Sequence, residues 1–551
     1  MTTKNLIKSI TASEWKLIIW TTVFIIIITT APYIYGWFQT PTDHTYTGLH
    51  SLTPGDMHVY FSYMEQVKQG YLLSEDIYTS EPQSRVILNG FWSSLGLFSL
   101  ITKTSNYFTF QLFRIILIPL FIISLYLISS WFWQKKIWRK ICFIFLCFGS
   151  GLGVIIYPFL SSETYIKGYY NLPLDMWAPE NNNLLTILQS PHLISATALI
   201  ILILLLFYFA TESNKTSYSL GAGILSLSLF QFHPFHIPTI LAVISIYIII
   251  LSIKYNKILY SYLKHFLIII AISSPSILYY SVLEKYDFIT QIRTYQNICL
   301  TPSLLVVFFS YGFLILLSIY ALYKIISSSR INNKHIFLAV WLIVQFSLLY
   351  SPLPFQRRLM QGLQIPMIIL AVYAIYHLNL IIKSNIKPKK YNYYFKNKYL
   401  AIIIFIIFFT PSNLYNLTRD IVVFKKTYPQ LYIHNDIIAG YNWLKQNTSP
   451  DDVILSDLYN GNLIPGHIGR KIFVGHGVET LFFESKLGLM AWFFSTNNYD
   501  LKKQIFLRQN SINYIFFSPN EKGIGDFNPS SKKYLKLTFK QNETEIYQVI
   551  K

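Results

Sequence analysis

The chain has little cysteine and little charge. Its 551 residues include only three cysteines, Cys142, Cys147 and Cys299, and these form neither a disulfide framework nor a zinc motif. Charged residues make up 13% of the chain, whereas 53% of the residues are hydrophobic and 17% are aromatic. A soluble protein of this length would carry more charge, so the composition indicates an integral membrane protein. Internal repeats and low-complexity tracts are also missing.

Long apolar segments fill most of the chain up to residue 411. We expect about 11 of them to cross the membrane as helices of about 20 residues, because lipid cannot hydrogen-bond an open backbone. The predicted spans lie near 17–35, 108–133, 138–160, 192–210, 218–232, 236–253, 262–282, 303–327, 336–352, 364–382 and 398–411. A further apolar stretch, 86–102, contains Asn89, Gly90 and Gly96 and is interpreted as re-entrant or interfacial.

Positive charge falls on one side of this arrangement. The formal net charge is +20, but the cations occupy short loops between spans and form no basic stripe, so we expect no nucleic-acid partner. These cations are Lys4, Lys8, Lys16, Lys135, Lys136, Arg139, Lys140, Lys215, Lys254, Lys257, Lys324, Arg330, Lys334, Lys383, Lys387, Lys389, Lys390, Lys396 and Lys398. The positive-inside rule then predicts a multi-pass protein of the plasma (inner) membrane with a cytoplasmic N-terminus.

The composition changes after Pro411. Residues 412–551 mix polar and apolar side chains and contain no further span. Short patterns predict strands at 453–456, 471–474, 514–517 and 545–549, and helices near 436–446, 480–494 and 499–509. The predicted fold is therefore mostly α, with a polytopic helical membrane bundle over 1–411 and a C-terminal extracytoplasmic α/β domain over 412–551.

The loop over residues 37–86 follows the first span and lies on the predicted outer side. Apolar residues recur at helical spacing from Met57 to Val67, and Gly70 fits a C-terminal cap, so we expect an interfacial helix. Asp56 stands at the start of this helix. Its carboxylate is either the helix N-cap or a general base for an acceptor hydroxyl.

A second acidic segment lies downstream in the same loop. Glu81 precedes Pro82, which fixes an extended backbone and could direct the Glu81 carboxylate inward. Glu75 and Asp76 are expected to be solvated.

The second large outer loop offers several ligand-type side chains. Asp175 and Glu180 could supply oxygen ligands to a divalent cation, although their spacing matches no known metal motif. Trp177 is interpreted either as a stacking platform for a sugar ring or as an interfacial anchor. His192 and His233 lie at predicted outer helix ends, where a histidine is either a ligand or a helix-terminus residue.

Paired arginines break the positive-inside pattern on the outer side. Arg357 and Arg358 precede the span near 364–382. They could form a salt bridge with an outer-loop acid, contact a lipid headgroup or capture a lipid phosphate, and the planar guanidinium favours phosphate capture. Arg114, near the outer end of its span, is predicted to add to the same cluster.

These features together resemble the GT-C superfamily of polyprenyl-phosphate-sugar-dependent glycosyltransferases, and in particular its bacterial members. The likeness covers most of the chain in architecture but only short segments in sequence. Those segments are Pro54-Gly55-Asp56, Thr79-Ser80-Glu81-Pro82-Gln83, Gln356-Arg357-Arg358, Gly469-Arg470 and Gly475-His476.

The resemblance implies an inverting transfer of a sugar from a polyprenyl-phosphate carrier to a glycan, lipid or protein acceptor at the outer membrane face. Asp56 would deprotonate the acceptor hydroxyl, Glu81 would position substrate or a cation, and the arginine pair would stabilise the leaving phosphate. The residues implied in binding substrate or lipid phosphate are Arg114, Trp177, His192, His233, Arg357 and Arg358.

The cofactor requirement is open. Many members of the superfamily carry two adjacent acids or an Asp-x-Asp motif in the first loop, whereas Asp56 lies between Gly55 and Met57. No cofactor is certain, and a divalent cation bound through Asp175 and Glu180 is the candidate.

Two other functions fit part of the pattern. A polysaccharide ligase or polymerase would also use lipid-linked sugars and outer arginines, but its large outer loop would come later in the chain. A non-catalytic transporter of lipid-linked sugars would call for intramembrane charges and related halves, and the sequence has neither feature.

Overall fold

The computed structural model describes residues 3–160, 166–328, 331–385, 398–426 and 428–550. The chain forms two compact units. Unit 1 comprises Met1–Ala31, Leu112–Tyr280 and Ile298–Arg419, and unit 2 comprises Pro32–Gln111, Ser281–Asn297 and Asp420–Lys551. This division differs from the predicted boundary after residue 411, because the first outer loop groups with the C-terminal segment.

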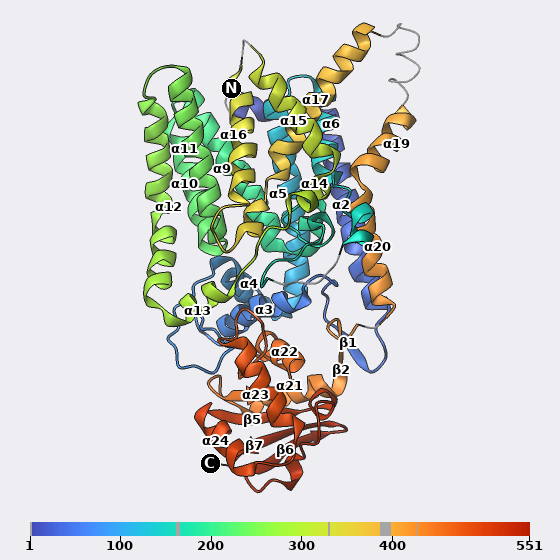
Figure 1. The fold of residues 1–551 in the computed structure, drawn as a ribbon, viewed down its shortest axis with the longest axis vertical. Helices are drawn as coiled ribbons and strands as arrows, with labels where there is room; N and C mark the ends of the chain where they lie inside the picture. Colours follow the sequence, from blue (N-terminus) through green and yellow to red (C-terminus); the bar gives the residue numbers. More distant parts are fainter. Residues whose placement is uncertain (1–2, 161–165, 329–330, 386–397, 427, 551) are drawn as a thin grey trace. The chain divides into compact units, whose positions relative to one another are not determined.

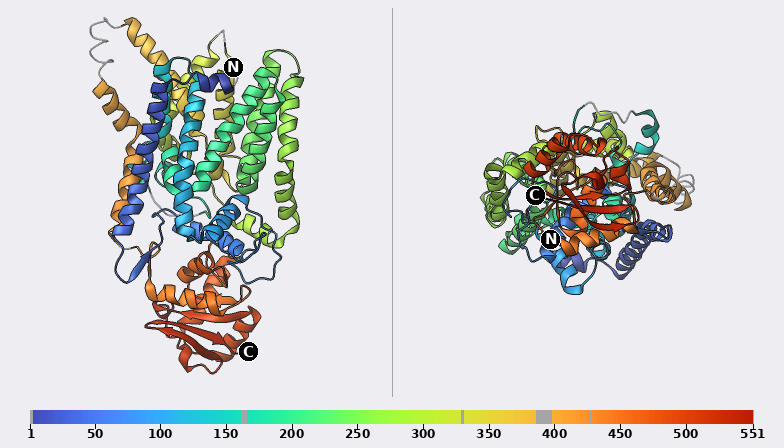
Figure 2. Two further views of the ribbon diagram at one scale, coloured as in Figure 1. Left: turned by 180° about the vertical axis from the view of Figure 1, so that it is seen from behind. Right: turned by 90° about the horizontal axis from the view of Figure 1, so that it is seen from below.

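Long apolar helices make up most of unit 1, and α9 to α12 run side by side in both views (Figures 1 and 2). Among the described residues, seven helices are long and apolar enough to cross a membrane, or up to nine if each of two bent pairs is one span. The seven are Ala12–Phe38 (α2), Asn106–Phe132 (α5), Lys136–Phe159 (α6, α7 and η1), Pro191–Ser213 (α9), Pro234–Lys254 (η3 and α11), Tyr260–Tyr286 (α12) and Gln364–Ser384 (within α17). Large side chains such as Trp131, Tyr247 and Trp341 fill the core of the bundle.

Each of the predicted spans contains a helix, but two of these helices are short. The helix α10 (Thr216–Phe232) has 17 residues and α16 (Asn333–Leu348) has 16. A membrane crossing takes about 20 residues. The two helices therefore account for part of the difference between the prediction and the observed spans.

Two more predicted spans are broken. The helices α14 (Leu304–Tyr311) and α15 (Phe313–Ile326) meet at 93°, and the helical segments Ile402–Phe409 and Pro411–Phe424 (α20) meet at 70°. The first break falls at Gly312, whose φ of 54° suits glycine. The second falls at Pro411, which begins a new helix because its missing N–H ends the earlier one. Of the predicted cytoplasmic cations, Arg330, Lys387, Lys389, Lys390 and Lys396 lie outside the described residues.

The stretch predicted as re-entrant or interfacial forms α4 (Gly90–Thr102) in unit 2. The side chain of Asn89 caps this helix by accepting a hydrogen bond from the backbone N–H of Trp92. With 13 residues, α4 is too short to cross a hydrocarbon core about 30 Å thick. Its length fits the predicted non-spanning segment.

Unit 2 contains a mixed five-stranded sheet with the order β4-β3-β5-β7-β6. Its strands are β3 (Val453–Leu455), β4 (Lys471–Ile472), β5 (Ile512–Phe517), β6 (Leu535–Gln541) and β7 (Thr544–Val549). β3 pairs in parallel with β4 and β5, whereas β7 pairs antiparallel with β5 and β6. Four of these strands match the predicted ones, and β6 was not predicted.

Helices pack on both faces of this sheet. They are α21 (Asn435–Asn447), α23 (Phe483–Ser495) and α24 (Asp500–Gln509), which match the predicted helices. Alternation along β5 places Ile515 and Phe517 in one core with α23 and α24. On the opposite face, the ring of Phe516 lies 5.3 Å from the ring of Tyr441 in α21. The C-terminal segment is therefore a layered α/β structure.

The helix predicted in the first outer loop is α3 (Pro54–Lys68). Gly70, with φ of 93°, follows its C-terminal end, as predicted. Met64 on the apolar face is fully buried, and the ring of Tyr60 stacks 4.7 Å from the ring of Trp92 in α4. Protein side chains thus cover residues that the sequence pattern assigned to the membrane interface.

The first outer loop and the C-terminal segment share the core of unit 2. α22 (Leu458–Ile468) packs along α3, and a Cβ atom added to Gly466 would lie 2.8 Å from the carbonyl oxygen of His58. β1 (His44–Tyr46) pairs antiparallel with β2 (Tyr432–His434). These contacts explain why the loop groups with residues far along the chain.

A glycine in α22 gives a direct test of this packing. A Cβ atom on Gly461 would lie 2.0 Å from the carbonyl oxygen of Val474, so Gly461→Ala should destabilise unit 2 by about 1–3 kcal/mol or more. Gly488 in α23 has no atom within 4 Å of such a Cβ, and Gly488→Ala should stabilise its helix by up to about 1 kcal/mol. Thermal unfolding of the purified protein measures both changes, and equal midpoints for the two variants would contradict this packing.

Candidate functional site

Asp56 lies in the first turn of α3 and is not its N-cap. The N-cap is Thr53, which has a left-handed backbone with φ of 44° and makes no side-chain cap hydrogen bond. The Oδ1 atom of Asp56 instead lies 3.1 Å from Nε2 of His476, in the loop between β4 and α23. The N-cap interpretation is therefore wrong, because the carboxylate pairs with an imidazole. The Asp56 side chain is 53% exposed and that of His476 is 14% exposed, so the pair is open to solvent on the Asp56 side.

The hydrogen bonds of His476 indicate which ring nitrogen carries the proton. Its Nδ1 accepts the backbone N–H groups of Val478 and Glu479, each at 3.3 Å. The proton of a neutral ring therefore sits on Nε2 and is donated to Asp56. A charged ring also donates from Nε2 to Asp56, but its Nδ1 then carries a proton and cannot accept the two backbone N–H groups.

The charge state of His476 depends on two opposing effects. Burial lowers the pKa of His476, but the hydrogen bond to Asp56 and the negative charges of Asp56, Glu479 and Asp76 outweigh burial, so the pKa is raised above its ordinary value. The ring stays cationic to a higher pH than an ordinary histidine. Its ion pair with Asp56 is complete below the ordinary pKa and is lost as the pH rises through the raised one.

A buried arginine joins three segments of unit 2. Arg293 of α13 (Phe288–Gln296) pairs with the carboxylate of Glu479, and its Nε lies 3.4 Å from Oδ2 of Asp76. Its Nη2 donates to the hydroxyl of Tyr63 at 3.2 Å. Burial raises the pKa of Asp76 to about 7 against the opposing charge of Arg293. Arg293 thus holds Glu479, whose backbone N–H in turn holds His476.

The expectation that Glu75 and Asp76 are solvated is wrong. Both residues are 3% exposed. The carboxylate of Glu75 lies 2.6 Å from Arg85 and 2.9 Å from Lys471. Each acid therefore has a cationic partner that compensates for its burial.

Glu81, the second predicted catalytic residue, is also paired. Its Oε2 lies 2.7 Å from Nζ of Lys486 in α23, and the hydroxyl of Thr79 donates to the same oxygen. Burial lowers the pKa of Lys486, and the negative charge of Glu81 offsets part of that effect. Asp56 and Glu81 thus contact the same stretch of the C-terminal segment, from His476 to Lys486. The catalytic roles of both acids stay predictions.

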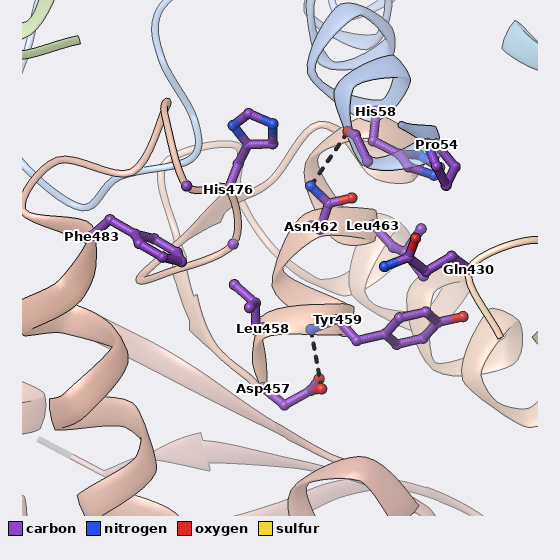
Figure 3. Close-up of a pocket in the computed structure, with 13 residues that line it drawn as sticks. Pro54, His58, Gln430, Asp457, Leu458, Tyr459, Asn462, Leu463, His476 and Phe483 are labelled. Atoms are coloured by element: carbon purple, nitrogen blue, oxygen red, sulfur yellow. Dashed lines mark hydrogen bonds between the residues drawn. The ribbon is translucent and has the colours of Figure 1, made fainter. Parts of the chain in front are cut away.

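A cavity of about 380 Å³ lies within unit 2 next to His476 (Figure 3). The N-terminal end of α3, the first part of α22 and the loop before α23 form its walls. In Figure 3, His476, Asn462, Tyr459 and Phe483 surround the open space. The nitrogen of the Asn462 amide donates to the carbonyl of Gly55 at 3.4 Å and so links α22 to α3.

In unit 1, the two predicted arginines lie against aromatic rings. The guanidinium of Arg357 is 4.4 Å from the ring centroid of Trp177, and its Nη1 is 3.9 Å from Oε2 of Glu180. The guanidinium of Arg358 is 4.4 Å from the ring centroid of Phe235. We call Arg357, Arg358 and their partners Trp177, Glu180 and Phe235 the arginine cluster.

The thiol of Cys299 lies close to the two arginines of this cluster, and their charges change its pKa. Burial would raise the pKa of Cys299, but the positive charges of Arg358 and Arg357 outweigh burial and lower it. The backbone N–H of Arg357 also donates to the carbonyl of Cys299 at 2.9 Å. The arginine cluster therefore stabilises negative charge at its surface.

The predicted histidines lie together in unit 1. The ring of His233 stacks 5.9 Å from the ring of His192 and 4.7 Å from the ring of His236. Nε2 of His236 lies 2.9 Å from Oε1 of Gln361, which follows the arginine pair in the chain. The histidine stack and the arginine cluster are thus connected through the short segment that contains both Arg358 and Gln361.

Two other predicted residues of unit 1 are fully buried. Arg114 donates to the hydroxyls of Thr29 at 3.3 Å and Thr30 at 3.0 Å. That Arg114 acts together with Arg357 and Arg358 stays a prediction. Asp175 accepts the backbone N–H of Gly153 at 3.1 Å, and burial raises its pKa to about 7.

Metal binding through Asp175 and Glu180 stays a prediction from the sequence. Within the described part of the chain, no three His, Cys, Asp or Glu side chains form a group that could hold a metal ion. Glu180 faces Arg357, whereas the Asp175 carboxylate receives the Gly153 N–H.

The partners of the predicted acids were missed at the level of sequence. His476 was part of a short motif, but no role was assigned to it, and Arg293, Glu479 and Lys486 were not singled out. His476 lies 420 residues from Asp56 in the chain, so no local pattern joins the two.

Comparisons with known proteins identify the fold. No family model matches the chain, and no curated protein matches it in sequence. The crystal structure of the Archaeoglobus fulgidus oligosaccharyltransferase in its apo form is similar, with 11% identity and a TM-score of 0.53 over 96% of this chain and 74% of that one. The archaeal oligosaccharyltransferase AglB from Archaeoglobus fulgidus, in complex with an inhibitory peptide and a dolichol-phosphate, has 11% identity and a TM-score of 0.51 over 90% and 69%.

A third similar structure is ArnT from Cupriavidus metallidurans bound to undecaprenyl phosphate, with 9% identity and a TM-score of 0.48 over 96% of this chain and 98% of that one. The two archaeal matches show that this chain shares the fold of that oligosaccharyltransferase. The chain is a multi-pass membrane protein with this fold.

The Arg293 ion pairs predict a large effect on stability. Arg293→Met leaves Asp76 and Glu479 without their cation, which should destabilise unit 2 by about 3–5 kcal/mol. Arg508, an exposed residue of α24, provides the control, because Arg508→Met should change stability by less than about 0.5 kcal/mol. Thermal unfolding of the purified variants compares the two, and an unfolding midpoint for Arg293→Met as high as that of the control would show that the ion pairs are dispensable.

Proposed function

We propose that this protein is a membrane glycosyltransferase that moves a sugar from a polyprenyl-phosphate carrier to an acceptor, with inversion at the sugar. The observation that carries the proposal is the Asp56–His476 pair at the start of α3 in a chain with a GT-C fold. It supports a carboxylate that is fixed in orientation and open to a substrate hydroxyl.

On the acceptor side, Asp56 acts as the general base. His476 donates its Nε2–H to one carboxylate oxygen at 3.1 Å, which orients the carboxylate and stabilises its anionic form. Asp56 then receives the proton of the acceptor hydroxyl. His476 is a positioning residue in this proposal, because it acts through Asp56.

On the donor side, Arg357 and Arg358 bind the phosphate of the carrier. Both guanidinium groups lie against aromatic rings, and Arg357 also faces a carboxylate, that of Glu180 at 3.9 Å. Guanidinium groups bind phosphate oxygens through paired hydrogen bonds and stabilise the charge that develops on a leaving phosphate. Trp177 gives Arg357 an aromatic surface, and the same ring could contact the apolar face of a sugar. The similar archaeal structure AglB was solved in complex with a dolichol-phosphate, which fits a phosphate-bearing polyprenyl lipid.

The reaction is a single displacement. The acceptor oxygen forms a bond to the anomeric carbon while its proton passes to Asp56. The bond between the anomeric carbon and the phosphate oxygen breaks, and the lipid phosphate leaves with the bonding electrons. Attack from the face opposite the leaving group inverts the anomeric carbon.

We place this chemistry at the outer face of the plasma (inner) membrane. The lysine-rich loops would lie in the cytoplasm with the N-terminus, and the first outer loop and the C-terminal segment would lie outside. A glycan, a lipid or a protein on that side would be the acceptor, and a further role of Glu81 would be to position substrate beside its partner Lys486.

Replacement of the base is the first test. Asp56→Asn should lower transfer from polyprenyl-phosphate-linked hexoses and pentoses by about a hundredfold or more, because the amide cannot accept the acceptor proton. The protein should remain folded, since Asp56 is 53% exposed. The assay measures radiolabelled sugar transferred by the purified protein to a crude envelope acceptor.

Asp43→Asn is the matched control, because Asp43 is an acid of the same loop with a side chain 59% exposed. It should retain normal transfer. If Asp56→Asn retains activity close to that of the control, Asp56 is not the base.

Replacement of the arginines tests the donor side. Arg357→Gln and Arg358→Gln should each raise the KM for the polyprenyl-phosphate sugar by about tenfold to a hundredfold, because each removes charged hydrogen bonds to the phosphate. Lys257→Gln, at an exposed cation in a loop of unit 1, should leave the KM unchanged. Donor titration gives all three values, and unaltered KM values in both arginine variants would place the phosphate elsewhere.

A further inference from the structure

The cavity beside the Asp56–His476 pair is lined by few charged side chains. Among the described residues that line it, there is no lysine or arginine, and the only carboxylate is that of Asp457. Both oxygens of Asp457 are used at the N-terminus of α22, where they accept the backbone N–H groups of Asn460 at 2.9 Å and Tyr459 at 3.1 Å. His476, which also lines the cavity, donates its Nε2–H to Asp56 at 3.1 Å. The lining therefore offers no unpaired charge to an ionic ligand.

A buried histidine in this cavity lacks a protein partner. His58 is 1% exposed, and neither of its ring nitrogens has a hydrogen-bond partner among the described residues. Burial lowers the pKa of His58 well below its ordinary value, and the neighbouring rings of His467 and His476 lower it further. The ring is therefore neutral at physiological pH, with one donor and one acceptor. A buried polar group without a partner is costly, and the two ring nitrogens of His58 would need two hydroxyl groups, one to accept a hydrogen bond and one to donate.

The remaining walls combine rings with amides. Tyr459 and Phe483 contribute aromatic surface, and Gln430 and Asn462 contribute amide groups. The hydroxyl of Tyr459 donates to the carbonyl of Pro429 at 2.7 Å, which fixes its ring. Aromatic faces contact the C–H groups of a sugar ring, while amides and imidazoles bond its hydroxyls. Figure 3 shows these groups around one open space.

We propose that this cavity binds one or two rings of a neutral carbohydrate. Its volume of about 380 Å³ lies in the usual range of small-molecule sites, roughly 300–1,000 Å³. The assignment of this sugar as the acceptor rests on the proposed function, because only then does the Asp56 base act on a hydroxyl of the bound ring. The acceptor is accordingly a glycan, whereas an anionic sugar would find no unpaired positive charge in the lining.

Binding can be measured without any donor. The purified full-length protein in detergent is mixed with methyl α-D-mannopyranoside, methyl β-D-glucopyranoside or lactose, and saturation-transfer NMR reports contact with each sugar. Glucuronate and a neutral tetrapeptide are the comparison ligands. The neutral sugars should give the strongest transfer, and glucuronate and the peptide should give little.

Two variants remove parts of the lining. Phe483→Ala and Gln430→Ala should each weaken sugar binding by about threefold to tenfold, because each removes one contact of moderate strength. Gln430 is exposed and Phe483 is only partly buried, so both variants should fold. Tyr499→Ala is the control, because Tyr499 is an aromatic residue with 56% exposure that does not line the cavity.

The outcomes separate the two proposals. Sugar binding that weakens in both lining variants but not in the control supports the cavity, even if transfer from polyprenyl-phosphate sugars is never observed and the proposed function fails. Equal binding by all variants, no binding of neutral sugars, or preferred binding of the peptide or of glucuronate would overturn the cavity proposal, even if Asp56-dependent transfer is observed.

Discussion

The ion pairs of Arg293 are the interaction on which the candidate site depends. Arg293 comes from a short helix that is distant in sequence from both of its acids, yet it holds Asp76 of the first outer loop and Glu479 of the C-terminal segment together. Asp76 is buried and Arg293 and Glu479 are only partly exposed, so the cation offsets the cost of removing these carboxylates from water. The backbone of Glu479 then fixes the ring of His476, and His476 fixes the carboxylate of Asp56. A site residue with 53% exposure thus owes its geometry to a buried network behind it.

Each unit, taken by itself, carries one part of the proposed chemistry. Unit 2 presents a carboxylate with an imidazole partner and a cavity lined by rings and amides, which suits a hydroxyl-bearing acceptor. In unit 1, two guanidinium groups lie against aromatic rings, and their charges lower the pKa of the nearby Cys299 thiol. Such a pair of cations suits a phosphate leaving group. Glycosyl transfer from a lipid phosphate needs both, a base for the nucleophile and positive charge for the leaving group.

Long apolar segments were enough to predict the membrane-spanning helices of unit 1, and local patterns predicted the helix α3 with Gly70 at its end and four of the five strands of the C-terminal sheet. The helices α8 (Asn183–Gln189) and α20 were not predicted. The alternation of Leu535, Leu537 and Phe539 with Lys536 and Lys540 is typical of a half-buried strand. The edge strand β6 could have been predicted from this alternation but was missed. Broken helices at Gly312 and Pro411 look continuous in a hydropathy profile. The ion-pair partners of the acids could not be predicted from the sequence. Adjacent loop acids such as Glu75 and Asp76 are typical of solvated positions, and no local pattern indicates which cations they contact in the fold.

The account as a whole requires the first outer loop and the arginine segment to lie on the outer side of the membrane. Single cysteines at three exposed positions can test this directly in a Cys299→Ser background: Asp43→Cys in the loop, Pro352→Cys before the arginines, and Lys257→Cys in a predicted cytoplasmic loop. A membrane-impermeant maleimide should label the first two in intact cells and the third only after permeabilisation. Labelling of Lys257→Cys in intact cells, or protection of either of the other two, would contradict the proposed arrangement.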